Sequence, residues 1–127
     1  MQHYPGPILI VDDDGDIRAV LRVLLEMDGY AVLEAEHGFA AYEVLTAHPE
    51  IACIILDLHM PVMGGRPFLE LLQRDGTLAQ IPVIVASASL IAAESTVQFG
   101  AVDVLKKPFD TKVLLELVER VCRKDVE

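Results

Sequence analysis

The feature that most constrains this chain is a fivefold alternation between short apolar runs and longer stretches with apolar residues at helical spacing. The runs occupy residues 8–11, 31–35, 51–56, 82–86 and 101–105, and the third contains no charge. Strands that are apolar throughout, rather than at alternate positions, are typical of sheets covered on both faces. The alternation therefore predicts an α/β fold with a parallel sheet between two layers of helices.

The stretches between these runs are predicted to be helices. The first begins after an N-cap at Asp14 and closes at Gly29, which suits a C-cap. Its apolar positions are Ile17, Val20, Leu21, Leu24 and Met27. Further helices are predicted over residues 39–47, 67–74 and 89–99, and Asp110 begins a last one whose core stripe is Leu114, Leu117, Val118 and Val121.

Length and charge narrow the class of protein. The 127 residues are expected to form one domain, residues 1–127. No apolar run approaches the roughly 18–20 residues of a membrane span, and residues 1–7 lack the features of a signal peptide. A net charge of −10 argues against direct binding to nucleic acid. We expect a soluble, cytoplasmic protein with no membrane contact, in which Cys53 and Cys122 are buried thiols rather than a disulfide.

Polar residues gather where the predicted strands end. Asp12 and Asp13 follow the first run, Asp57 the third, Ser87 the fourth and Lys107 the fifth. In open α/β sheets, ligands bind beyond the carboxyl ends of the strands, where the strand order reverses. A flavodoxin-like order of 2-1-3-4-5 makes the first and third strands neighbours, so the three carboxylates would converge.

Converging carboxylates repel one another, and a divalent cation removes that penalty. Oxygen ligands suit Mg²⁺, with Mn²⁺ as the alternative, and no Cys or His cluster indicates zinc. A carboxylate such as Asp57 can also be a nucleophile that forms an aspartyl-phosphate, assisted by a hydroxyl at Ser87 and a cation at Lys107. Lys107 is preferred to Lys106, which would point to the opposite side of its strand. No role is assigned to the acids of residues 34–36.

The acidic residues also have simpler interpretations. Residues 12–14 could be only acids at a helix start, where the dipole favours them, and Asp57 only a turn residue before Pro61. The metal interpretation is favoured because a charge at the end of so apolar a run is otherwise unexplained. Asp14 is expected to be the N-cap rather than a ligand.

Four segments together form a recognisable set: ILIVDDD at 8–14, IILDLHMPVMGG at 54–65, IPVIVASA at 81–88 and KPF at 107–109. In these segments, and over essentially its whole length, the chain resembles the receiver domains of two-component response regulators, which are CheY-like in fold. The resemblance implies that Asp57 is the phosphoacceptor. It implies that Asp12 and Asp13 serve the metal, with Asp13 the more direct ligand, and that the backbone carbonyl of His59 is a further ligand.

The resemblance also implies roles at the other strand ends, with departures. Ser87 matches the switch hydroxyl, and Lys107 matches the lysine of the family, whose bond to Pro108 is typically cis. The family usually has an aromatic residue, which swings inward on activation, where Val104 stands. Residues 64–67, Gly-Gly-Arg-Pro, also depart from the usual sequence, which often has Asp-Gly at the first two positions.

The implied function is a phosphorylation-dependent switch. It would take a phosphoryl group from a sensor histidine kinase or phosphotransfer protein and alter a surface that binds a downstream protein. It would catalyse only its own phosphorylation and dephosphorylation, so it is not expected to be an enzyme for another substrate. No output domain is recognised in these residues, which leaves a stand-alone regulator or one domain of a longer protein. Apolar residues beyond the needs of one core face occur at Phe99, Val102 and Val104 and in the last helix, such as Val113 and Leu115. They indicate a partner or dimer face on the fourth predicted helix, the fifth strand and the last helix.

Three other functions stay open. A Mg²⁺-dependent phosphatase with an aspartyl-phosphate intermediate usually has a carboxylate where His59 stands, and needs a cap domain for its substrate. A flavodoxin-like electron carrier needs a hydroxyl- or glycine-rich phosphate loop after the first strand, where this chain is acidic. A degenerate receiver that acts as a constitutive adaptor is disfavoured by the full acceptor set.

Overall fold

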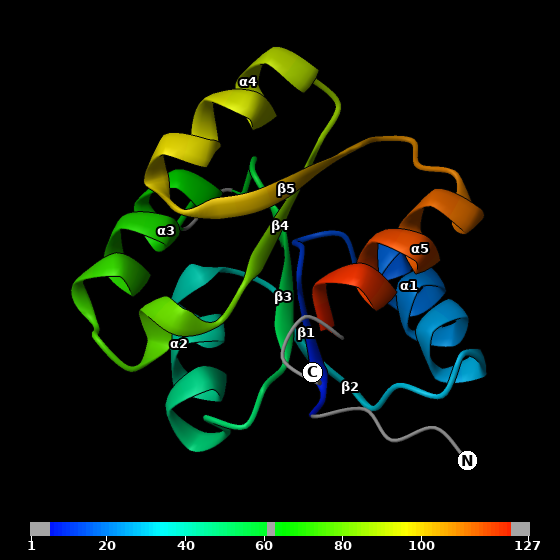
Figure 1. Cartoon of the computed structure of the whole chain (residues 1–127), viewed down its shortest axis with the longest axis horizontal. Helices are drawn as coiled ribbons and strands as arrows, with labels where there is room; N and C mark the ends of the chain where they lie inside the picture. Colours follow the sequence, from blue (N-terminus) through cyan, green and yellow to red (C-terminus); the bar gives the residue numbers. More distant parts are fainter. Residues whose placement is uncertain (1–5, 61–62, 123–127) are drawn as a thin grey trace.

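Each predicted apolar run forms a strand in the computed structural model, which describes residues 6–60 and 63–122. The strands are β1 (Ile8–Val11), β2 (Val32–Ala35), β3 (Cys53–Asp57), β4 (Val83–Ser87) and β5 (Ala101–Lys106). They are all parallel and lie in the order β2-β1-β3-β4-β5 (Figure 1). The predicted flavodoxin-like sheet is therefore confirmed.

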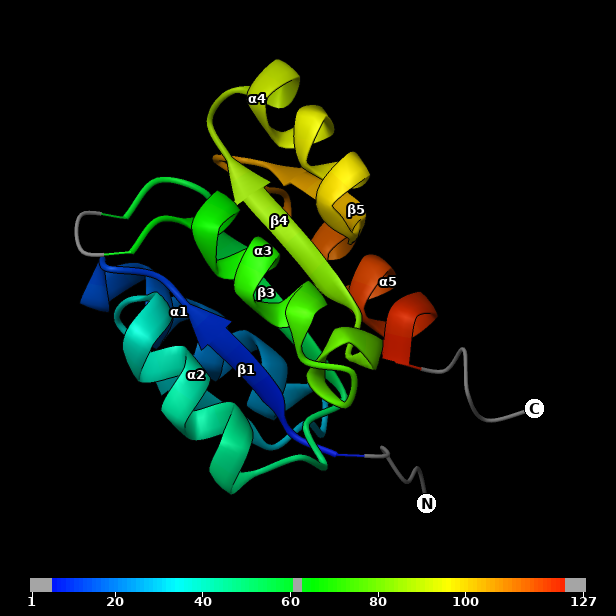
Figure 2. The same cartoon turned by 90° about the vertical axis from the view of Figure 1, so that its left-hand side faces the viewer.

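Helices cover both faces of this sheet. They are α1 (Gly15–Met27), α2 (Gly38–Ala47), α3 (Gly65–Arg74), α4 (Leu90–Glu94) and α5 (Thr111–Cys122), with 3₁₀ turns over Leu78–Gln80 and Ser95–Phe99. Helices α1 and α5 lie on one face and α2, α3 and α4 on the other (Figures 1 and 2). Each face has its own apolar cluster, one built around Leu25 and Leu114 and the other around Leu45 and Phe68.

The register of the strands aligns their carboxyl ends. Val11 of β1 pairs with Leu56 of β3, so the chain leaves β1 beside the point where Asp57 ends β3. Asp57 pairs in turn with Ala86, one residue before the end of β4. Asp57 and Ser87 are thus the last residues of their strands, whereas the sequence placed them just after the strands. Because all the strands run in one direction, these polar ends share one edge of the sheet.

The helix predicted over residues 89–99 is wrong in its second half, which is a 3₁₀ turn rather than α-helix. The hydroxyl of Ser95 donates to the carbonyl of Ala92, and that of Thr96 donates to the carbonyl of Ala93. Side chains that bond to the carbonyls of the preceding turn compete with the regular backbone ladder. The α-helix accordingly ends at Glu94.

The apolar stripe predicted for α1 is only partly buried. Leu21 and Leu25 are buried, whereas Val20 is 56% and Met27 is 80% exposed. The helix carries two interleaved apolar stripes, and only the one that meets β1 and β2 enters the core. Spacing along the sequence does not distinguish these two stripes, so the burial expected for Val20 and Met27 is corrected.

The described residues test several further predictions. Cys53 and Cys122 are both buried, free thiols in the cluster under α1 and α5. The predicted caps are confirmed: Asp14 accepts hydrogen bonds at the start of α1, and Gly29 has a φ of 98° just after its end. None of the described helices combines the length and apolarity needed to cross a membrane. Two predictions fall partly outside the described residues: the absence of a signal peptide, at residues 1–5, and the turn after Asp57, at Pro61 and Val62.

Candidate functional site

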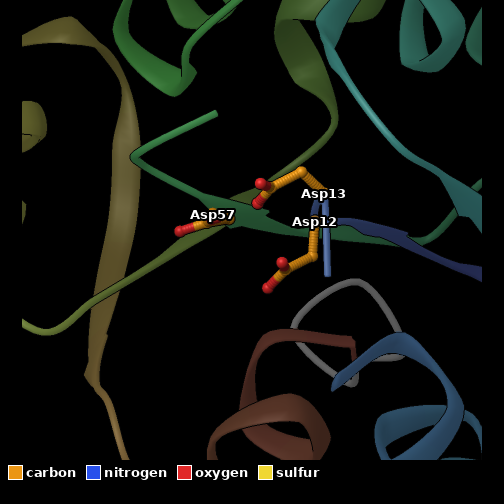
Figure 3. A group of neighbouring side chains, drawn as sticks. All are labelled: Asp12, Asp13 and Asp57. Carbon is orange, nitrogen blue, oxygen red and sulfur yellow. The ribbon is translucent and has the colours of Figure 1, made fainter. Parts of the chain in front are cut away.

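Three carboxylates converge at the carboxyl ends of β1 and β3, as the sequence predicted. One oxygen each of Asp12, Asp13 and Asp57 lies within 4.8 Å of the other two. Figure 3 shows the three side chains turned toward one region at this edge of the sheet. Asp12 and Asp57 are only 3% and 6% exposed, while Asp13 is exposed to solvent. Two buried charges and one open charge therefore share a small volume.

Asp12 is held on every side by hydrogen bonds. Its backbone N–H donates to the carbonyl of Ala35 at 3.1 Å, which fastens it to the end of β2. Its Oδ1 accepts from the N–H of Asp14 at 2.9 Å, and its Oδ2 accepts from Lys107 Nζ at 2.9 Å. Each carboxylate oxygen of Asp12 thus has a hydrogen-bond partner, as buried polar atoms usually do. These bonds fix the orientation of the Asp12 side chain in the site.

The surroundings of Asp57 disfavour the charged form of its carboxyl group. Burial, and then repulsion from Asp12, raise the pKa of Asp57, although Lys107 and the N–H of His59 act in the opposite direction. The His59 N–H donates to Asp57 Oδ1 at 3.3 Å, and Lys107 Nζ lies 3.2 Å from the same oxygen. A desolvated carboxylate beside a cation, at the rim of a strand, is a common arrangement for a reactive group.

Lys107, the residue that follows β5, bridges the two buried carboxylates. Its Nζ contacts both Asp12 and Asp57, and those two carboxylates raise its pKa although burial acts against the charge. Lys106, by contrast, is exposed. The bond from Lys107 to Pro108 is cis, as the resemblance implied. The backbone N–H of Lys107 also donates to the carbonyl of Ser87, which ties the segment after β5 to the end of β4.

Ser87 reaches the same edge of the sheet from β4 and is buried. Its Oγ accepts a hydrogen bond from the N–H of Ser89 at 3.0 Å. Because that bond uses a lone pair, the hydroxyl hydrogen stays available for an acceptor. Ala88, beside it, is small and exposed. The strand-end set Asp12, Asp13, Asp57, Ser87 and Lys107 is therefore assembled as its sequence positions predicted.

The donor set fits a hard divalent cation. The three converging ligands are all carboxylate oxygens, and one of them is open to solvent, which suits Mg²⁺ with water in its remaining positions. One ammonium, that of Lys107, offsets three carboxylates only in part. The backbone carbonyl of His59 stays a predicted ligand, although the N–H of the same residue bonds to Asp57.

Of the two glycines that follow Asp57, Gly65 is required by the path of the backbone. A Cβ at Gly65 would lie 2.9 Å from the Asp57 carbonyl oxygen, so the backbone passes too close for a side chain. Gly64 is the N-cap of α3 in extended backbone and makes no side-chain cap bond. The atypical Arg66 stacks over the ring of Phe99 at 4.4 Å. Val104, at the usual aromatic position, packs half-buried against the core.

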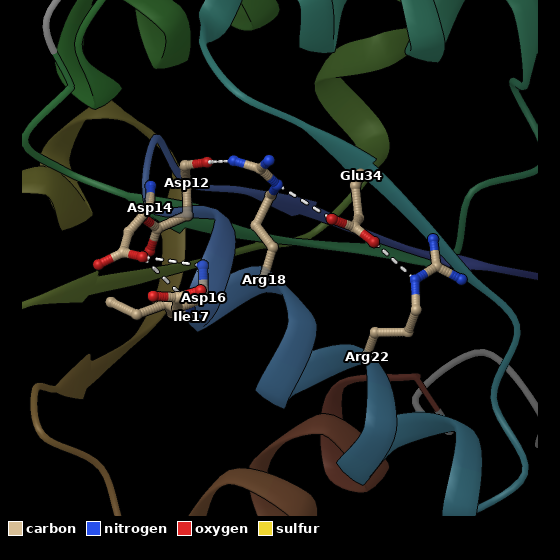
Figure 4. Close-up of polar contacts among 7 residues, drawn as sticks. All are labelled: Asp12, Asp14, Asp16, Ile17, Arg18, Arg22 and Glu34. Atoms are coloured by element: carbon tan, nitrogen blue, oxygen red, sulfur yellow. Dashed lines mark hydrogen bonds and ion pairs between the residues drawn. The ribbon is translucent and has the colours of Figure 1, made fainter.

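Sequence reasoning missed a pair of charges behind the site. The guanidinium of Arg18, on α1, donates to the carbonyl of Asp12 and to Glu34 of β2 (Figure 4). The signal was Glu34, the one charge inside an otherwise apolar strand. A lone charge at such a position needs a partner.

Comparison with known proteins decides the family. Residues 8–119 match the family described as the response regulator receiver domain. The chain belongs to this family. It is 34% identical over 117 residues to chemotaxis protein CheY1 of Helicobacter pylori, a match that covers 90% of this chain and 94% of CheY1. It is 35% identical to the phosphate regulon transcriptional regulatory protein PhoB of Pseudomonas aeruginosa, covering 92% of this chain and 52% of PhoB.

Solved structures agree with this assignment. The chemotaxis protein CheY4 of Vibrio cholerae superposes with a TM-score of 0.84 at 29% identity, covering 91% of this chain and 98% of CheY4. The signal receiver domain of a histidine kinase from Syntrophus aciditrophicus gives a TM-score of 0.85 at 30% identity, covering 96% and 95%. Receiver domains of two-component systems thus share both the fold and the sequence pattern of this chain.

Proposed function

We propose that this receiver domain is a phosphorylation switch in which Asp57 accepts a phosphoryl group from a histidine kinase or a phosphotransfer protein. The observation that carries the proposal is the position of Asp57: buried at a strand end, 3.2 Å from Lys107 and within 4.8 Å of two other carboxylates. A carboxylate that only stabilised the fold would gain little from burial beside Asp12, which raises its pKa. As a nucleophile, the same carboxylate lies beside an ammonium and two further carboxylates that could hold a cation, and these positive charges would neutralise phosphoryl oxygens.

In the proposed reaction an Asp57 oxygen attacks the phosphorus of a phosphohistidine. The new O–P bond forms as the P–N bond breaks, and the histidine nitrogen leaves with the electron pair and takes up a proton. A Mg²⁺ ion bound by Asp12, Asp13, Asp57 and the His59 carbonyl would supply positive charge for the phosphoryl oxygens, and Mn²⁺ could replace it. Water attack on the acyl phosphate reverses the switch.

Lys107 and Ser87 have separate proposed roles. The Lys107 ammonium already contacts the Asp57 carboxylate and would neutralise a phosphoryl oxygen there. The Ser87 hydroxyl, whose hydrogen is free to turn, would donate to another. The domain would act only on itself, and so would not be an enzyme for another substrate. Two buried free thiols fit the reducing cytoplasm as its location.

The test is phosphorylation by a small donor. The protein is incubated with acetyl phosphate and Mg²⁺, and the intact mass is recorded after rapid quenching. We expect the mass of one added phosphoryl group in the wild type, and none when Mg²⁺ is chelated or when Asp57 is replaced in Asp57→Asn. No adduct with Mg²⁺ or Mn²⁺ would reject the proposal and favour a constitutive adaptor.

A surface beside the site suits the protein donor. A pocket next to Lys107 is lined by Ile17 and Val20 of α1 and by Phe109 after β5. Val20 is exposed there, and Val23 on the same helix is equally exposed (54%) but does not line the pocket. These two valines form a matched pair. With a protein donor, Val20→Asp should slow phosphotransfer more than Val23→Asp, while both variants react normally with acetyl phosphate.

A separate apolar face is proposed to bind the downstream partner. The exposed residues Ile91, Val97, Val102 and Val113 lie on α4, the following 3₁₀ turn, β5 and α5. Three residues expected on this face, Phe99, Val104 and Leu115, instead pack against the core clusters and are not part of it. The face would bind a downstream protein or a second receiver after phosphorylation. Analytical ultracentrifugation of phosphorylated and unphosphorylated protein tests the dimer, and an unchanged monomer at high concentration would reject it.

A further inference from the structure

Arg18 connects the acidic pair to the neighbouring strand. Its Nη1 donates to the backbone carbonyl of Asp12 at 2.5 Å, and its Nε donates to Glu34 Oε1 at 3.0 Å. Glu34 lies on β2, in register with Ile10 of β1, two residues before Asp12. Figure 4 shows the guanidinium between the two acids, reaching back from α1. One side chain therefore bridges α1, the end of β1 and β2.

Glu34 is itself fixed from two sides. Its second oxygen accepts from Nε of Arg22 at 2.6 Å, and Arg22 also pairs with Glu26 on the same helix. Arg22, and to a smaller extent Arg18, hold the pKa of Glu34 below its usual value although burial acts against them. Glu34 thus stays a carboxylate and orients the guanidinium of Arg18.

The contact at the carbonyl of Asp12 matters because Asp13 is the next residue in the chain. A peptide unit is planar, so fixing the carbonyl of Asp12 also fixes the direction in which the chain enters Asp13. Asp13 is exposed, and within residues 6–60 and 63–122 no hydrogen bond or ion pair is assigned to its carboxylate. Its orientation toward Asp12 and Asp57 therefore depends on the backbone.

We propose that Arg18, held by Glu34, is a positioning residue that sets the peptide between Asp12 and Asp13 and so places the Asp13 carboxylate for a divalent cation. This inference rests on the Mg²⁺ site of the proposed function. Partners behind the ligands of a metal site commonly matter for affinity because they fix the geometry of those ligands. Arg18 does this through the backbone and touches neither the cation nor the phosphoryl group.

Charge and geometry make opposite predictions for the loss of Arg18. A guanidinium repels a nearby cation, so its removal by charge alone would tighten the binding of Mg²⁺. Loss of the bond to the Asp12 carbonyl would instead release the Asp13 peptide and weaken binding. The sign of the change in affinity therefore distinguishes positioning from a simple electrostatic effect.

The chain contains a matched control. Arg22 is on the same helix, carries the same charge and bonds to the same Glu34, but makes no recorded contact with Asp12 in the described residues. Mg²⁺ binding to the full chain would be measured by isothermal titration calorimetry for wild type, Arg18→Gln and Arg22→Gln. We expect about tenfold weaker binding in Arg18→Gln and less than about twofold change in Arg22→Gln. The thermal midpoints without metal should fall by similar amounts in both.

A second pair of variants keeps the charge constant and guards against a folding defect. In Arg18→Lys the ammonium lacks the fork that reaches two acceptors, so Mg²⁺ should bind more weakly than in Arg22→Lys. Equal affinities within each pair, or tighter binding in Arg18→Gln, would overturn the inference while leaving the proposed function intact. A wild type that binds neither Mg²⁺ nor Mn²⁺ would instead reject the proposed metal site itself.

Discussion

At their amino ends, β1 and β3 bring Ile8 against Cys53, and both side chains are fully buried among apolar neighbours. At their carboxyl ends, β1 is followed directly by Asp12 and β3 ends in Asp57, and these two residues are buried almost as deeply but have carboxylate side chains. The amino end gains free energy from the removal of apolar area from water. At the carboxyl end, burying two carboxylates side by side costs free energy and offsets part of that stabilisation.

The difference shows how one sheet separates stability from reactivity. Apolar residues along the strands hold the edge of the sheet in place, and this rigidity forces carboxylates together that would move apart in a flexible loop. Lys107 offsets part of this repulsion but not all of it, since burial and Asp12 still raise the pKa of Asp57. The remaining repulsion is what a bound divalent cation can relieve.

The largest expected effect comes from the apolar part of β3. Ile55 is buried and lies two residues before Asp57, so both point to the same side of the strand. Ile55→Ala should lower the free energy of unfolding by about 3 kcal/mol, because the cavity cannot collapse in a close-packed core. Urea unfolding measures this, and a loss well under 1 kcal/mol would show that the strand is not the rigid base of the site.

The next effect should come from the cation itself. Mg²⁺ at about ten times its dissociation constant should raise the free energy of unfolding by roughly 1.4 kcal/mol, since it binds only the folded site. Asp13→Asn should reduce this gain, with Asp16→Asn, an exposed neighbour outside the carboxylate cluster, as control. Thermal unfolding at increasing Mg²⁺ tests it. An identical midpoint shift in the two variants would mean that Mg²⁺ does not stabilise the protein through the carboxylate cluster.

A smaller effect, opposite in sign to that of Ile55→Ala, is expected at Asp57. Because the folded pKa of Asp57 is raised, its ionisation disfavours the folded state once the pH exceeds the unfolded value of about 3.9, and fully so above the raised value. Asp57→Asn should therefore be more stable than wild type at pH 7 without metal, and the gap should narrow toward pH 4. Denaturant unfolding at both pH values decides this. A variant less stable at pH 7 would mean that the contact with Lys107 outweighs burial and repulsion.

The smallest effect concerns the loop beyond the site. Gly64 begins α3 in extended backbone and has room for a Cβ at ordinary contact distances. Gly64→Asp should stabilise the protein by a few tenths of a kcal/mol, since the carboxylate can accept a hydrogen bond from the N–H of Arg66 in the first turn of α3. Gly65→Ala is the contrasting variant and should destabilise, because its Cβ would press on the Asp57 carbonyl. Chemical unfolding of both tests this, and equal effects would contradict it.

The strands could be predicted because each is an uninterrupted apolar run, and the placement of acids after the first and third indicated the strand order. The helix over residues 89–99 could not, because the hydroxyls of Ser95 and Thr96 compete for backbone carbonyls in a way that apolar spacing does not reveal. Val20 was misplaced because the orientation of α1 depends on the sheet beneath it.

The clustering of the strand-end residues could be predicted for a similar reason. Asp57, Ser87 and Lys107 each stand at a strand end, and parallel strands bring their ends together whatever the loops do. The bridge made by Arg18 could not be predicted, because its contact with Asp12 needs the first turns of α1 to fold back over β2. Side-chain bridges between elements depend on tertiary geometry, whereas strand ends depend on the order of the chain.

The most direct test of the site is to locate the phosphoryl group. After treatment with acetyl phosphate and Mg²⁺, borohydride reduction converts an aspartyl-phosphate to homoserine, and peptide mass spectrometry reads its position. We expect homoserine at position 57, in a yield that falls with Mg²⁺ chelation, and unmodified Asp12 and Asp13. Homoserine at position 12 or 13, or at none of the three, would contradict the assignment of Asp57 as the nucleophile and of the acidic pair as its metal ligands.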